Sequence, residues 1–144
     1  MNRKQKLKLC NLWLLGVAVL TLASSLQMEI CGGKGVGSLS FLQMMYLHCF
    51  VGFIMLILII LHLYLHFGTQ NWITKIKCLK SVPTKRLCVV FAIMIILSIV
   101  ALLHVFPQMV HTTVGAVHGK VGFLFLLLCM GHCLKRRKFF CKMT

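Results

Sequence analysis

Two pairs of histidines with the same spacing are the residues of this sequence best suited to chemistry. His48 and His62 lie fourteen residues apart, and so do His118 and His132. In an α-helix this interval is close to four turns, so both members of a pair project from one face, roughly 21 Å apart along the axis. Histidine is costly in apolar surroundings, where it usually has a partner or a metal. We therefore predict that the four imidazoles are axial ligands of two haem irons.

A repeated sequence motif, called the repeated phrase below, begins at the first histidine of each pair. The two copies read His48-Cys-Phe-Val-Gly-Phe and His118-Gly-Lys-Val-Gly-Phe. Gly52 and Gly122 therefore lie one turn after the histidine, on the same helix face. Glycine is also common where membrane helices pack closely, which would explain either glycine alone but not their matching offset. A haem is a flat disc that needs a strip of helix without side chains, so we expect both glycines to lie against one.

The composition predicts an integral membrane protein. Hydrophobic residues make up 60% of the 144 residues, and the mean hydropathy is +0.95, far above soluble domains. Four apolar stretches are long enough to cross a bilayer. We expect an all-α domain over residues 1–144, a four-helix transmembrane bundle with helices at roughly 9–30, 45–67, 87–106 and 116–134.

The basic residues predict the orientation in the membrane. Sixteen Lys and Arg stand against one acidic residue, Glu29, for a net charge of +15. All but Lys34 and Lys120 lie before the first span, between the second and third, or after the fourth. The positive-inside rule places these regions, and both termini, in the cytoplasm. Because membrane topology accounts for the charge, we expect no nucleic-acid partner.

The N-terminal helix has two interpretations. Residues 1–25, a basic start followed by an apolar run and Ala23-Ser24-Ser25, also fit a secretory signal peptide. Against cleavage, Lys8-Leu9-Cys10 at the first helix is echoed by Arg86-Leu87-Cys88 at the third. The echo favours retention of the first helix, and it indicates that one helical hairpin was duplicated to give the chain.

The order of the spans predicts how the histidines pair. The second and fourth helices are separated by one span, so they run in the same direction. His48 and His118 should lie at one depth, near the outer surface, and His62 and His132 at another, toward the cytoplasm. Each pair could hold one iron from opposite faces.

Other side chains have more than one interpretation. His66, four residues after His62, competes with it as inner ligand or lies at the interface near a haem propionate or a quinone. His104 and His111 could carry protons for a quinone or could be polar residues at the water boundary. Lys120 could bind a propionate or could extend to the surface from a helix start.

The eight cysteines form no recognisable site. There is no Cys-x-x-Cys-His, so we expect b-type haem rather than covalently attached haem. The spacings match no zinc pattern. Four of them lie at the reducing cytoplasmic face (Cys10, Cys78, Cys88 and Cys141) and Cys31 is alone outside, so we expect no structural disulfide.

The whole pattern resembles the dihaem four-helix bundle of respiratory cytochrome b and smaller bacterial four-helix membrane proteins of the cytochrome-b-like kind. The residues that carry the resemblance are His48, His62, His118, His132, Gly52 and Gly122. It implies two bis-histidine b haems that conduct electrons between a quinol or redox partner on one side and an acceptor on the other. It also implies a bacterial inner membrane. The additional helices and quinone-site loops of the large respiratory cytochrome are missing.

Two other functions stay open. The chain could be a membrane quinone, ferric or superoxide reductase that uses the same haems, with a substrate site near His66, His104 or His111. It could also be a haem-free transporter or channel lined by histidines. The near-absence of Asp and Glu argues against the latter, because proton and metal paths generally need carboxylates.

Overall fold

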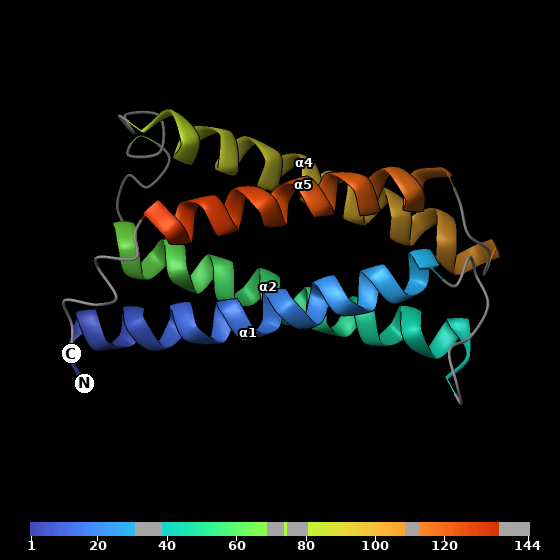
Figure 1. The fold of residues 1–144 in the computed structure, drawn as a ribbon, viewed down its shortest axis with the longest axis horizontal. Helices are drawn as coiled ribbons and strands as arrows, with labels where there is room; N and C mark the ends of the chain where they lie inside the picture. Colours follow the sequence, from blue (N-terminus) through green and yellow to red (C-terminus); the bar gives the residue numbers. More distant parts are fainter. Residues whose placement is uncertain (31–38, 69–73, 75–80, 109–112, 136–144) are drawn as a thin grey trace. The chain divides into compact units, whose positions relative to one another are not determined.

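Four long helices make up most of the described protein. The computed structural model describes residues 1–30, 39–68, 74, 81–108 and 113–135. The helices are α1 (Arg3–Ile30), α2 (Phe41–Phe67), α4 (Val82–Gln108) and α5 (Thr113–Lys135) (Figure 1). Each is long and apolar enough to cross a membrane. The prediction of an all-helical chain with four such segments is confirmed, and it is consistent with a four-helix bundle.

α1 and α2 begin earlier than hydropathy predicts because capping groups, not apolarity, start them. Ser40 Oγ accepts the Gln43 N–H at 3.3 Å, and Gln43 Oε1 accepts the Ser40 N–H at 2.8 Å, which is a capping box. Asn2 and Gln5 exchange the same two bonds, each 2.9 Å long, before α1. The polar residues that follow are good helix formers, so α1 begins at Arg3 instead of near residue 9.

Replacing Ser40 with alanine is expected to destabilise the protein by about 1 kcal/mol, because the amide of Gln43 loses its acceptor. The measurement is thermal unfolding in detergent, followed by circular dichroism. Ser40→Asp is the matched control, since aspartate caps as well as serine. Equal losses in the two variants would contradict a capping role.

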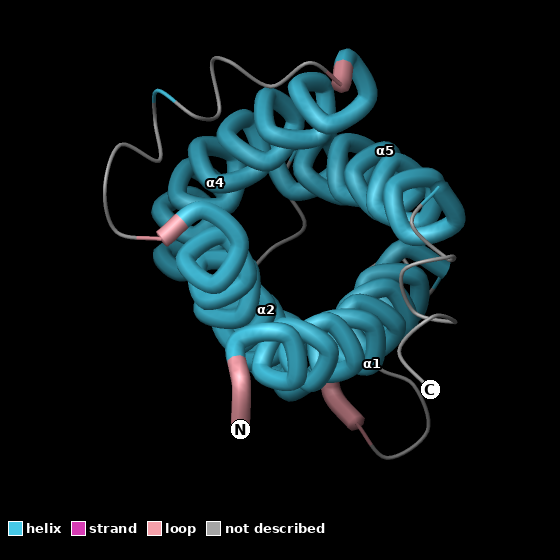
Figure 2. The backbone as a smooth tube through the Cα atoms, turned by 90° about the vertical axis from the view of Figure 1, so that its left-hand side faces the viewer, coloured by secondary structure: helices cyan, strands magenta, loops and turns pink. Residues whose placement is uncertain are grey.

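The chain divides into two compact units, Met1–Cys78 and Leu79–Thr144. The first contains α1 and α2, and the second contains α4 and α5. Within each unit the two helices pack side by side as an antiparallel hairpin (Figures 1 and 2). The predicted duplication of one hairpin, and the cytoplasmic location of both termini, stay predictions.

In the first hairpin, the start of α1 lies beside the end of α2. Arg3 Nε donates to the carbonyl of Leu65 at 2.8 Å, and Arg3 Nη2 donates to that of His66 at 3.2 Å. The guanidinium thereby compensates the partial negative charge at this helix end. Gly68 ends α2 with a φ of 78°, which favours glycine, and its N–H donates to the Tyr64 carbonyl at 2.8 Å.

Small and polar side chains form much of the contact between α1 and α2. Thr21 Oγ1 donates to the Val17 carbonyl at 2.8 Å, and Ser24 Oγ donates to the Thr21 carbonyl at 3.0 Å. Their hydroxyls are therefore satisfied within α1, and small side chains let two membrane helices approach closely. The buried residues of this hairpin are Cys10, Val17, Thr21 and Ser24 of α1 and Met44, Met45 and Val51 of α2.

The second hairpin packs through aromatic and sulfur-containing side chains. The rings of Phe91 in α4 and Phe125 in α5 stack, with their centroids 5.7 Å apart. Phe125 is buried. A Cβ added at Gly122 would lie 3.5 Å from Met94 Cε, so this glycine faces α4 within its own hairpin.

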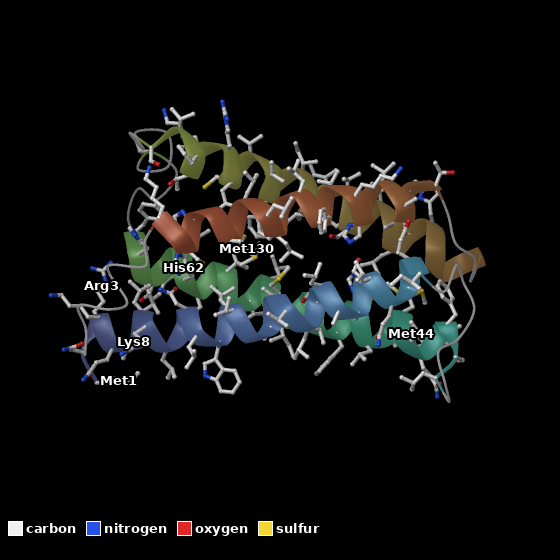
Figure 3. All side chains as sticks on the ribbon, in the orientation of Figure 1. Met1, Arg3, Lys8, Met44, His62 and Met130 are labelled. Carbon is white, nitrogen blue, oxygen red and sulfur yellow. The ribbon has the colours of Figure 1, made fainter. Side chains whose placement is uncertain are left out.

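Large apolar side chains project outward from every helix. Leu12, Trp13 and Ile96 are each more than 60% exposed, which would be costly in water and is favourable in hydrocarbon. The basic residues Arg3 and Lys8 lie toward one end of α1, and Met44 lies near the opposite end of the same hairpin (Figure 3). Such a distribution fits helices in a lipid bilayer.

Candidate functional site

The candidate site begins with His48 and His62, which α2 presents on the side that contacts α1. Both side chains are partly buried. Each ring makes a hydrogen bond through Nδ1 to a polar side chain of α1. The chemistry of each partner indicates which ring nitrogen carries the hydrogen.

Ser24 orients His48. The distance between Ser24 Oγ and His48 Nδ1 is 2.9 Å, and Ser24 is only 5% exposed. The single hydroxyl hydrogen of Ser24 is donated to the Thr21 carbonyl, so Oγ accepts toward the ring. With the hydroxyl donated to Thr21, this arrangement corresponds to His48 with its hydrogen on Nδ1.

Asn11 orients His62 in the same way. His62 Nδ1 lies 2.7 Å from Asn11 Oδ1, and an amide oxygen can only accept. His62, which is labelled in Figure 3, therefore also carries its hydrogen on Nδ1. In a neutral imidazole of this tautomer, the lone pair that can bind a metal is on Nε2.

The two contacts share one helix register. Asn11 and Ser24 are thirteen residues apart in α1, and their histidines are fourteen apart in α2, in the opposite direction. An antiparallel pair of helices with equal rise brings such positions level with each other. α1 therefore supports both histidines of α2.

Sequence reasoning missed these two supports. From motifs and spacing, Ser24 is interpreted only as part of a possible cleavage site, and Asn11 has no predicted role. A usable signal existed, because a polar side chain within an apolar helix generally has a hydrogen-bond partner. Which residue becomes the partner depends on how α1 and α2 are aligned. A polar residue in the sequence of one helix carries no information about that alignment.

His66 lies one turn beyond His62. Its ring is exposed and its centroid is 6.0 Å from that of His62, with the planes tilted by 48°. The asparagine of α1 bonds to His62, which favours His62 as the oriented inner ligand. The location of His66 near a propionate or a quinone stays a prediction.

The histidines of α5 lie in the other unit. His118 and His132 are both partly buried, and Lys120 beside His118 is exposed. Their predicted pairing with the histidines of α2 joins the two units and stays a prediction, as does the role of Lys120. His104 of α4 bonds its own helix, with Nδ1 2.9 Å from the Val100 carbonyl, which it can only meet as donor.

The two glycines of the repeated phrase differ in their surroundings. A Cβ added at Gly52 would meet no atom within 4 Å, whereas one at Gly122 would meet the flexible end of Met94. Gly52 therefore keeps the side-chain-free strip that was expected of both positions. At Gly122 part of that strip is covered by a thioether, which can adopt other rotamers.

The donor groups of α2 fit a haem-ligating role. Metal-bound histidines almost always donate their other ring nitrogen to an oxygen acceptor, and Nδ1 of both His48 and His62 lies within hydrogen-bond distance of a side-chain oxygen. No group of three or more His, Cys, Asp or Glu side chains that could hold a metal ion occurs among the described residues. Axial ligation uses two histidines and does not require such a group.

Of the remaining candidate residues named from the sequence, some lie within the part of the chain that the structure describes and others lie outside it. Cys10, Cys49, Cys88, Cys129 and Cys133 are free thiols, and Glu29 is exposed near the end of α1. Outside the described residues lie His111, Lys34, Cys31, Cys78, Cys141 and the basic residues 136–138.

The fold and site together define a multi-pass helical membrane protein with polar supports built around two histidines of one helix. Comparisons with protein-family models, with curated proteins and with solved structures find no match to the chain.

Proposed function

We propose that the protein is a dihaem b-type cytochrome that conducts electrons across a membrane. The observation that carries the proposal is the pair of hydrogen bonds that join Nδ1 of His48 to Ser24 and Nδ1 of His62 to Asn11. Both imidazoles present Nε2 as the metal-binding nitrogen, and both come from one apolar helix. The same interval between His118 and His132 on α5 provides a matching second set.

In this proposal one haem is held by His48 and His118, and the other by His62 and His132. Haem iron with two axial imidazoles supplies one-electron redox chemistry and has no open position for oxygen. The protein orients the ligands, leaves space at Gly52 and excludes water through its apolar helices. Lys120 provides a cation for a propionate, and His66 lies at the end of the site where a quinone could exchange electrons.

The cellular setting follows from the basic residues. With the positive regions inside, both termini are cytoplasmic and the His62 end of α2 faces the cytoplasm. The proposed location is a bacterial inner membrane. The partner on each side is a quinol or a redox protein.

The direct test is to count the haems of the purified protein, produced with an ample supply of haem. A reduced-minus-oxidised spectrum combined with the pyridine haemochrome assay is expected to give two b haems per chain. The control is a variant in which all four ligands are replaced by alanine, which should be colourless. One haem would contradict the matched ligand pairs, and none would contradict the proposal.

A further inference from the structure

The supports that α1 gives to the two histidines of α2 are chemically different. Asn11 offers an amide oxygen at 2.7 Å from His62 Nδ1, whereas Ser24 offers a hydroxyl oxygen at 2.9 Å from His48 Nδ1. An amide oxygen is a stronger acceptor than a hydroxyl oxygen, and its contact with the ring is also the shorter of the two. Donation from Ser24 to Thr21 strengthens the hydroxyl as an acceptor, yet its distance to the ring stays the longer of the two.

We infer that Asn11 and Ser24 are positioning residues that hold the Nδ1–H tautomer and set unequal basicities at Nε2, higher in His62 than in His48. A stronger acceptor at Nδ1–H draws the proton away from the ring and raises the electron density on the other nitrogen. The inference about tautomers rests on the described contacts alone.

The consequence for reduction potential rests on the proposed function. A more basic ligand stabilises the more positive, oxidised metal, so the centre that includes His62 has a lower reduction potential than the centre that includes His48. α1, which carries none of the four ligands, thereby makes the two centres different although the histidine pattern is repeated.

The tautomers are tested in the full-length protein purified without haem. The method is ¹⁵N-histidine NMR, with the His48→Ala and His62→Ala variants used for assignment. Both rings are expected to be protonated at Nδ1. Asn11→Leu should shift only His62 toward the Nε2–H form, and Ser24→Ala should shift only His48. Ser24→Thr retains the hydroxyl and should behave as wild type. Wild-type rings protonated at Nε2 instead of Nδ1 would overturn the inference.

The basicities are tested by redox titration of the haem-loaded protein. Asn11→Leu should raise the potential of one centre, and Asn11→Asp, a stronger acceptor, should lower that same centre. Ser24→Ala should raise the other. A residue that only stabilised the fold would not shift the potential in opposite directions in Asn11→Leu and Asn11→Asp. If the protein binds two haems but these substitutions leave both reduction potentials unchanged, the inference is overturned and the proposed function stands. A colourless protein would overturn the proposed function. The NMR experiment would still test the tautomers in that case.

Discussion

Replacing His62 with alanine is expected to halve the haem content, from two b haems per chain to one. In the proposed function this imidazole is one of two ligands of its iron. Asn11 contacts the cofactor only through His62, so it cannot replace the lost ligand. His132→Ala should remove the same haem, since both residues belong to one pair. The measurement is the pyridine haemochrome assay together with the reduced spectrum of the haem that remains.

Two further variants make this result specific. His66→Ala should keep both haems, because the proposed inner ligand is His62, whose Nδ1 is bonded to Asn11. His104→Ala is the matched control, since His104 bonds its own helix and has no assigned ligand role. If His62→Ala and His132→Ala left spectrally different haems, the proposed pairing would be wrong.

A loss of stability has to be separated from a loss of ligand. In His62→Ala the partly buried Asn11 loses its hydrogen-bond partner, at a cost of about 1 kcal/mol. Asn11→Leu combined with His62→Ala removes both polar partners and should recover part of this stability. The haem content should stay at one haem per chain in both proteins. It is measured by the haemochrome assay, and the stability is measured by thermal unfolding of the same samples.

Replacing Gly52 with leucine is expected to displace most of the haem held by His48 and to leave the fold intact. A Cβ at this position meets no protein atom within 4 Å, so the added side chain begins in open space, and we expect its conflict to be with a cofactor that lies against the helix. Gly52→Ala should have a smaller effect, because it adds one carbon. Haem content is measured by the haemochrome assay and helix content by circular dichroism.

The matched control is Gly16→Leu in α1. Gly16 is also open, with nothing within 4 Å of an added Cβ, and it is exposed. This variant should retain both haems. Equal haem loss at Gly16 and Gly52 would show that leucine harms the membrane helices in general, and a fully loaded Gly52→Leu protein would remove the glycine from the proposed site.

The support that α1 gives to α2 bears on the fate of the N-terminal helix. Cleavage near Ala23-Ser24-Ser25 would remove Asn11 from His62 and would remove or free the residue that bonds His48. Both histidines of α2 would therefore lose the partner that α1 provides in the structure. Retention of this helix stays a prediction, and the mass of the mature protein would test it.

Several features were readable from the sequence because they are local. Long apolar runs predict the four helices, and the apolar ends of α1 and α2 match the structure at Ile30 and Phe67. The equal histidine intervals placed each candidate pair on one helix, α2 or α5. The capping residues Ser40 and Gln43 could have corrected the start of α2, since a capping box is itself a local pattern.

By itself, the sequence determined the number and type of the helices, the distribution of charge and the placing of two histidines on each of two helices, because these depend on hydropathy and on spacing along one chain segment. Only the tertiary structure decided that Asn11 and Ser24 bond His62 and His48, that Gly52 is open, and that Gly122 faces Met94. Such contacts depend on the rotation and axial shift of one helix against another. Many alignments bury similar apolar area, and packing together with hydrogen bonding selects among them.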